Sequence, residues 1–187
     1  MKRTADKKPT ISDQTIIGKN NVVIALVSTM ALIGMVGFSI YRYMDIGFFS
    51  RAELLAEIML IFFFAGRIKP KYTVELCGKE LRFTKRGWWG QGLYEVSCRD
   101  ILGIYRYAPR LVNPVRFRRT YRLHSALDPR AVWTLAYRVE QTGKSANQRI
   151  YFKAESDFLR ALNEKMPGKV SIEEAEVIKD VILSEKK

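Results

Sequence analysis

Arginine is concentrated in one stretch of this 187-residue chain. Between Arg99 and Arg138 there are nine arginines, no lysine and only two acids, Asp100 and Asp128. A planar guanidinium group is favoured where a carboxylate or a phosphate is bound through paired hydrogen bonds. We therefore expect the segment from Arg110 to Arg122 to dock against anionic lipid headgroups or an acidic partner; the alternative is that these arginines only solvate strand faces. The candidate binding residues are Arg110, Arg116, Arg118, Arg119 and Arg122.

Two adjacent tryptophans are candidates for a second kind of contact. Trp88 and Trp89 lie between the basic pair Lys85-Arg86 and Gly90. Aromatic rings with a polar edge are enriched at the depth of lipid headgroups. The pair is predicted to form an exposed interfacial turn, and burial inside a sheet is the alternative.

Residue types that support catalysis or metal binding are scarce. His124 is the only histidine, and Cys77 and Cys98 belong to no CxxC or Cys/His cluster, so neither a zinc site nor a histidine relay is predicted. The glycines between Gly87 and Gly92 lack the lysine and hydroxyl residue of a phosphate-binding loop. We predict no enzyme activity, no cofactor, no metal and no small-molecule substrate.

The net charge of +13 also suits nucleic acid as a partner. Aromatic residues alternate with arginine in Tyr105-Arg106-Tyr107, a composition found in single-strand binding surfaces. Because no nucleic-acid recognition motif accompanies them, nucleic acid is not predicted.

The elements that must position these residues begin with a membrane anchor. Asn20 to Tyr41 is a run of 22 residues without a charge, and about 20 apolar residues cross a hydrocarbon core of about 30 Å. We predict the first transmembrane helix over residues 20–43. A cleaved secretory signal is the alternative, because Gly37 and Ser39 are small, but its apolar core usually has only about 7 to 15 residues.

A second apolar segment, residues 46–68, is predicted to be the second transmembrane helix, joined to the first by a tight turn. Arg51 and Glu53 can reach the interface, whereas Glu57 lies about a turn deeper and is the candidate intramembrane polar residue. Small residues recur along the first helix, and three of them are expected to pack on the second; the alternative is that they are only the ordinary composition of a membrane helix. They are Ser28, Ala31 and Gly34.

Orientation follows from the basic residues in the flanking segments. Five precede the first helix, three directly follow the second and two lie in the turn between them. The positive-inside rule then places both termini in the cytoplasm of a multi-pass cell-membrane protein, with residues 1–19 as a cytoplasmic tail that is disordered to about Asp13. If residues 46–68 lay along the interface instead, the C-terminal domain would be exported.

From Lys71 the pattern changes to the alternation typical of half-buried strands. The domain at residues 71–168 is predicted to be an antiparallel sheet capped by a helix that begins near Ser156 and stops at Pro167-Gly168. A further amphipathic helix over residues 171–185 packs back on the domain, binds a partner helix or remains peripheral. The predicted strands are residues 72–77, 80–84, 93–98, 101–107, 119–125, 131–140 and 148–154.

Three segments carry a resemblance to a known group: Gly78-Lys79-Glu80-Leu81-Arg82-Phe83, Gly87-Trp88-Trp89-Gly90, and Val96 to Ile104 with its Asp100-Ile101 pair. With the two apolar segments before them, they resemble bacterial membrane proteins that carry a pleckstrin-homology-like domain. The resemblance implies a membrane α-hairpin followed by an α+β domain, a PH-like antiparallel β-sandwich or barrel of about seven strands with a C-terminal helix. Eukaryotic members bind phosphoinositides through basic residues in the first hairpin. Here that hairpin offers only Lys79 and Arg82, so inositol-lipid recognition is not expected.

These features predict a small integral membrane protein whose basic PH-like cytoplasmic domain is a binding or scaffolding module for proteins, with anionic membrane lipid as an additional ligand. The partner is either another protein or a second copy of the chain. The alternative is an accessory subunit of a membrane transporter or secretion complex. In that case Glu57 and the small-residue stripe pair with other membrane helices.

Overall fold

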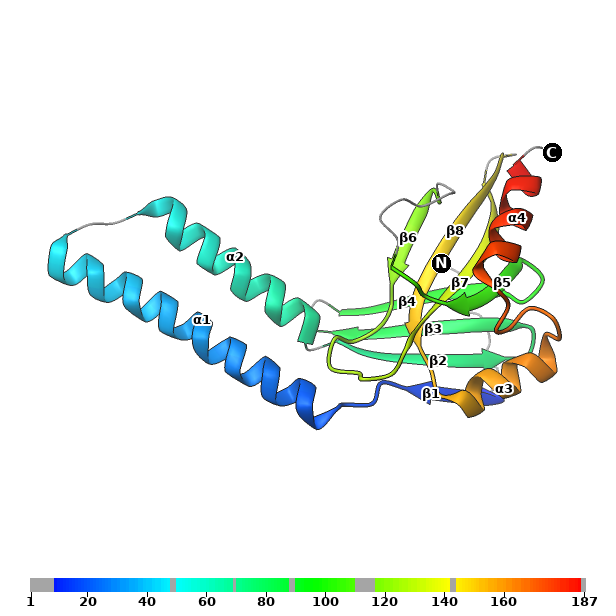
Figure 1. Ribbon diagram of the computed structural model, residues 1–187, viewed down its shortest axis with the longest axis horizontal. Helices are drawn as coiled ribbons and strands as arrows, with labels where there is room; N and C mark the ends of the chain where they lie inside the picture. The colour runs from blue at the N-terminus through cyan, green and yellow to red at the C-terminus, as the bar shows by residue number, and fades with distance from the viewer. Residues whose placement is uncertain are drawn as a thin grey trace.

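Two helices project from one end of a domain built on two β-sheets (Figure 1). The computed structural model describes residues 9–47, 50–68, 70–87, 90–109, 117–141 and 144–185. Within them lie eight strands and four helices. Seven of the strands lie within residues 71–168, as predicted, but the fold-class prediction is wrong, as shown below, in its two transmembrane helices and its purely antiparallel sheet.

The first sheet is antiparallel, in the order β1-β2-β3-β4. It contains β1 (Ile11–Gln14), β2 (Lys71–Cys77), β3 (Glu80–Gly87) and β4 (Gly90–Ser97). Side chains alternate as expected for strands with one buried face. Val74, Leu76 and Phe83 are buried, whereas Glu75 and Arg82, paired with each other across β2 and β3, are on the outer face.

Strand β1 corrects the prediction that the N-terminal tail is disordered to about Asp13. Ile11 pairs with Leu76 and Gln14 pairs with Thr73, so the tail is the edge strand of the first sheet. Two side chains hold it there: Ile11 packs against the hydrophobic core, and Asp13 is buried in an ion cluster described below. Four residues carry too short an alternation to be recognised beside a long apolar run.

The second sheet has the order β5-β7-β8-β6 and is mixed. Its strands are β5 (Ile101–Arg106), β6 (Arg119–Arg122), β7 (Val132–Gln141) and β8 (Lys144–Lys153). Strand β6 runs parallel to β8, because the chain after β6 returns through residues 123–131 before β7 begins. The predicted purely antiparallel sheet is wrong at this edge, where β6 is joined to the sheet through β8 alone.

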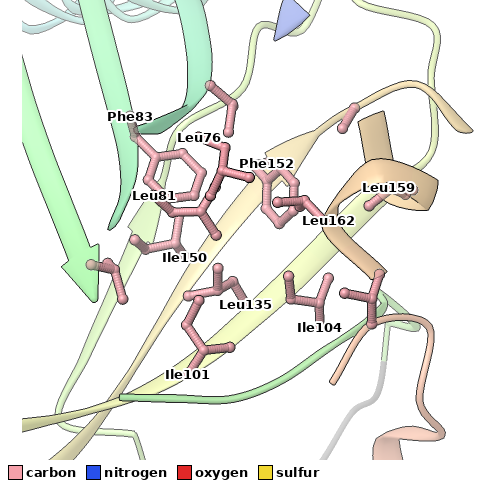
Figure 2. Close-up of a cluster of buried hydrophobic side chains, with 14 of the residues drawn as sticks. Leu76, Leu81, Phe83, Ile101, Ile104, Leu135, Ile150, Phe152, Leu159 and Leu162 are labelled. Atoms are coloured by element: carbon pink, nitrogen blue, oxygen red, sulfur yellow. The ribbon is translucent and has the colours of Figure 1, made fainter. Parts of the chain in front are cut away.

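The main core lies between the two sheets and helix α3 (Ser156–Lys165). Figure 2 shows Leu76, Leu81 and Phe83 of the first sheet facing Ile150 and Phe152 of the second, with side chains of α3 closing one side. The Phe83 and Phe152 rings meet edge to face with centroids 5.5 Å apart, a preferred aromatic geometry.

Helix α4 (Glu174–Glu185) packs back on the domain, on the face of the second sheet opposite the main core. Val177 and Val181 are fully buried against Tyr105 and Ala136. Gly103 of β5 permits this contact, because a Cβ there would lie 2.6 Å from Cγ2 of Val177. Of the three placements considered for this helix, the structure therefore has the one on the domain.

Helices α1 (Lys19–Ile46) and α2 (Arg51–Ile68) lie side by side and extend away from the sheets (Figure 1). Among the described residues only α1 is long and apolar enough to cross a membrane. The prediction of a second transmembrane helix over residues 46–68 is wrong, because the 18 residues of α2 contain four charges, Arg51, Glu53, Glu57 and Arg67. A multi-pass topology is therefore not supported.

Candidate functional site

Helix α1 is joined to the domain by a short segment that is hydrogen-bonded at nearly every residue. Thr15 and Tyr72 exchange backbone and side-chain hydrogen bonds of 2.9 to 3.0 Å. The Gly18 amide donates to the carbonyl of Leu127 at 2.9 Å, and the Asn21 amide group donates to the same carbonyl at 3.2 Å. The first turn of α1 is thus part of the domain, and no free linker separates them.

A buried ion cluster holds the segment before α1. Arg130 bridges two carboxylates, with Nη1 2.7 Å from Oδ1 of Asp13 and Nη2 2.7 Å from Oδ2 of Asp128. Asp13 also accepts a hydrogen bond from the Glu155 amide at 2.6 Å, and Asp128 accepts one from the Ile16 amide at 3.3 Å. The cluster therefore ties β1, the loop after β6 and the start of α3 to one another.

The electrostatics of this cluster favour its charged form. Burial alone would raise the pKa of Asp128, but hydrogen bonds from the Arg130 side chain and backbone outweigh it and hold that pKa below its ordinary value. Burial likewise opposes the charge on Arg130, yet hydrogen bonds to Asp128 and Asp13 raise its pKa. Both partners therefore stay ionised at neutral pH.

Glu57, the predicted intramembrane polar residue, faces α1. Its side chain is only 4% exposed and accepts a hydrogen bond of 2.7 Å from Ser39 Oγ. One turn away, Arg42 of α1 forms an ion pair with Glu53 of α2. Glu53 therefore has an ion-pair partner within the chain, whereas Glu57 has one hydrogen-bond donor and its buried Oε2 has no hydrogen-bond partner among the described residues.

The small residues of α1 are divided between two faces. Ser28 is half-buried in the structure, but Ala31 and Gly34 are exposed, so the predicted packing of all three on α2 is wrong. A three-residue spacing drifts around a helix of 3.6 residues per turn, which moves the later members off the contact. A Cβ added at Gly34 or Gly37 would meet no atom within 4 Å.

The predicted arginine site is not brought together as one surface. Arg110 and Arg116 lie outside the described residues. Arg118 is exposed just before β6, and Arg119 and Arg122 are three residues apart on β6, so strand alternation places them on opposite faces. Arg122, one of the three candidates that the structure describes, lies two residues from Thr120, whose register partner is a second arginine.

That second arginine is Arg149 of β8. Its guanidinium lies between two rings, 4.9 Å from the centroid of Phe117 and 5.1 Å from that of Tyr151, and its Nε donates to Thr120 Oγ1 at 2.9 Å. Register pairs Thr120 with Arg149 and Arg122 with Tyr151, so these side chains share one face. We call this surface of Phe117, Thr120, Arg122, Arg149 and Tyr151 the β6–β8 face.

Two properties of the β6–β8 face suit an anionic ligand. Stacking on Phe117 and Tyr151 restrains the Arg149 guanidinium, so little conformational entropy is lost when its remaining N–H groups bind. Burial raises the pKa of Tyr151, with Arg149 opposing the shift, so that the phenol is neutral at physiological pH. Tyr107 extends the aromatic surface, with its ring centroid 4.9 Å from that of Tyr151.

Sequence reasoning missed Arg149 because it lies outside the arginine-rich stretch. A usable signal was present in the alternation of β8, where the apolar Ile150 and Phe152 are two residues apart and so lie on one side of a strand. The intervening Arg149 and Tyr151 must then point to the other side.

The structure describes the two residues that flank the predicted tryptophan turn but not the turn itself. Trp88 and Trp89 lie outside the described residues, and β3 ends at Gly87 and β4 begins at Gly90 on either side of them. A Cβ at Gly87 would lie 3.7 Å from Cγ of Pro70, which directly precedes β2. The turn therefore starts at the end of the first sheet where the helices join it.

No protein-family model, curated protein or solved structure matches this chain.

Among the described residues, no group of three or more histidine, cysteine or acidic side chains could hold a metal ion. Cys77 is a buried free thiol and Cys98 is a half-buried one, and burial raises the pKa of both. A thiol with a raised pKa is a poor nucleophile at neutral pH.

Proposed function

We propose that this protein is a membrane-anchored binding module in which α1 inserts into a membrane and holds the β-domain at its surface. The main observation behind this proposal is that α1 has 28 residues, none of them buried, with large apolar side chains exposed around its circumference. An exposed apolar surface of this extent is unfavourable in water and favourable in lipid. The hydrogen-bonded segment from Thr15 to Gly18 would then fix the domain directly beneath the anchor.

The order of elements supports a retained anchor rather than a cleaved signal. Strand β1 precedes α1 in the chain, and it supplies Asp13 to the ion cluster and an edge to the first sheet. Cleavage after α1 would remove β1 and leave Arg130 and Asp128 without that partner. A discarded leader is not expected to contribute a buried strand.

The distribution of charge supports a cytoplasmic placement of the domain. Strands β1 and β2 pair in one sheet, so the segments before α1 and after α2 belong to the same domain. Basic residues, among them Lys19 and Lys71, crowd the base of the helices, and basic residues beside a membrane helix are retained in the cytoplasm. A PH-like module on the cytoplasmic surface remains the family resemblance that best fits this placement.

For the partner, we propose an acidic segment of another protein that binds the β6–β8 face. A carboxylate can form two hydrogen bonds with the stacked guanidinium of Arg149, and Arg122 beside it adds a second positive charge. Tyr107 and Tyr151 provide apolar surface next to these charges.

Exchange of Arg122 and Arg149 for glutamine tests the β6–β8 face. The full-length protein in mild detergent is titrated with a fluorescent oligoglutamate peptide, and binding is followed by anisotropy. Loss of two charge-assisted contacts is expected to weaken binding about tenfold or more. The matched control exchanges Arg99 and Arg160, which are exposed elsewhere on the domain, and should retain most of the affinity. Equal losses in the two double variants would show that only net charge matters and would refute the proposed face.

A second candidate function, an accessory subunit of a membrane assembly, is supported by the open face of α1. Ala31 and Gly34 are exposed, and the space around Gly34 and Gly37 would admit the backbone of another helix. Exchange of Gly34 and Gly37 for leucine is expected to abolish co-purification of a membrane partner or of a second copy of the chain. Exchange of the exposed Val23 and Val27 for leucine is the control. Unchanged co-purification in the glycine variant would exclude this candidate.

A further inference from the structure

We infer that a groove on the outer face of the first sheet binds the headgroup of an anionic phospholipid. The groove has a volume of about 700 Å³ and is lined by side chains of β1 to β4 and of the segment that leads into α1. The inference rests on the proposed insertion of α1 into a membrane, and it concerns a surface separate from the β6–β8 face.

The position of the groove is the first argument. Ile17, two residues before α1, and Lys71, three residues after α2, both line it. The groove therefore reaches the end of the sheet from which both helices leave, beside the Pro70–Gly87 contact. If α1 is in a membrane, this end of the domain is the one nearest the headgroups.

The charged side chains of the groove are distributed unevenly along the strands. At the end remote from the helices, Arg82 lies between Glu75 and Glu95 in the strand register, and its Nε is 2.9 Å from Oε1 of Glu95. At the end near the helices, Lys71 is paired across the strands with Arg86, and Arg86 with the neutral Gln91. Among the described residues that line the groove, none at this end is acidic, so the positive charge of Lys71 and Arg86 is concentrated at the end next to the proposed membrane surface.

The groups between these two ends suit a phosphodiester with its glycerol. The middle row across the strands consists of Thr73, Thr84 and Leu93, which offer two hydroxyl groups and one apolar side chain. Leu93 is 54% exposed and Ile17 is 52% exposed, so the lining includes apolar surface that water disfavours. A ligand with an anionic head and apolar tails matches both parts of this lining better than a soluble phosphate does.

The first hairpin turn, which the family resemblance associates with inositol lipids, is a different place. Lys79 follows Cys77 at the far end of β2, the end opposite Lys71. The basic end of the groove, at Lys71, is therefore at the opposite end of β2 from the first hairpin turn.

The test measures lipid bound to the full-length protein. Dioleoylphosphatidylglycerol is titrated into the protein in neutral detergent, and lipid adducts are counted by native mass spectrometry. Wild-type protein is expected to bind it in preference to dioleoylphosphatidylcholine. Exchange of both Lys71 and Arg86 for glutamine should reduce the affinity about tenfold or more, because each basic residue at an anionic surface contributes severalfold. Exchange of Arg99 and Arg160 for glutamine, with the same loss of charge, should leave it unchanged.

Three results would overturn the inference: equal binding of the two lipids, no effect of the Lys71 and Arg86 exchange, or equal affinity for water-soluble glycerol phosphate, which would identify a soluble ligand. Extraction of cell membranes with alkaline carbonate separates this failure from failure of the anchor. Protein that stays in the membrane but shows one of the three results refutes the groove alone. Protein that is released refutes the insertion of α1, and the groove inference fails with it.

Discussion

Replacing Arg130 with methionine is expected to lower the free energy of unfolding by about 3 to 5 kcal/mol, the range found when one member of a buried ion pair is removed. Asp13 and Asp128 would be left buried without the cation that bridges them. Measurement is by chemical unfolding of the full-length protein in detergent, followed through the fluorescence of tryptophan, including the partly buried Trp133.

The control for this prediction is an ion pair in which both partners are exposed. Arg160 and Asp157 are 3.8 Å apart, and their side chains are 75% and 81% exposed. Replacing Arg160 with glutamine should change the stability by less than about 0.5 kcal/mol. A loss in the Arg130 variant no larger than that in the Arg160 variant would mean that the cluster does not hold β1 in place.

The same cluster predicts a dependence of stability on pH. Because the pKa of Asp128 is lower in the folded protein than in the unfolded chain, its contribution is complete above the ordinary pKa of an aspartate, about 4, and is lost as the pH falls through the lowered value. In the Arg130→Met variant, burial without a cation raises this pKa instead. The difference in stability between wild type and variant should therefore begin to shrink above about pH 4, where the raised carboxyl of the variant takes up a proton, and should shrink further below about 4 as Asp128 of the wild type does so. A constant difference would contradict the assignment.

Replacing Gly103 with alanine is expected to destabilise the protein by about 1 to 3 kcal/mol and to loosen α4 from the second sheet. The added Cβ would lie 2.6 Å from Cγ2 of Val177 and 3.1 Å from Cδ1 of Ile172, both in the segment that covers β5. Hydrogen exchange read by mass spectrometry should show faster exchange in α4 and little change in α3, which packs on the other face.

A second substitution distinguishes this clash from a general effect on strand β5. Shortening Val177 to alanine removes the methyl groups in the way, so the double variant should lose less stability than the sum of the two single variants. Gly92→Ala is the control in a strand, because its Cβ would make only ordinary contacts of 3.5 Å or more. Strict additivity of the Gly103 and Val177 changes would show that the alanine acts on something other than α4.

The sequence predicts structure best where a single hydrophobic period continues through a long helix or strand. The alternation of β7 and β8 places Leu135 and Ile150 on the buried face, and the structure finds both there. The uninterrupted apolar run likewise indicates α1. Such patterns reflect burial of one face, which is a local property of each element.

The incorrect or absent predictions concern pairing between segments that are far apart in the sequence. The hydrophobic periodicity within one segment gives no information on such pairing. Strand β1 is held by Asp13 reaching Arg130, 117 residues further along the chain. Arg149 joins Arg122 only because β6 runs parallel to β8. The second apolar segment was wrongly predicted for a different reason. Its apolar composition resembles that of a membrane helix, but it also contains acidic residues, and two of them, Glu53 and Glu57, contact Arg42 and Ser39 of α1.

The pairing of β1 with β2 has a consequence for the order of synthesis. Residues 11–14 leave the ribosome before either helix, yet their partners, residues 73–76, follow some sixty residues later. Closing so long a loop is entropically costly and is favoured only once its far end is in place. The first sheet is therefore completed after both helices have been made, when β1 pairs with β2. A bulky fusion at the N-terminus would hinder this last step, whereas one at the C-terminus would leave it free.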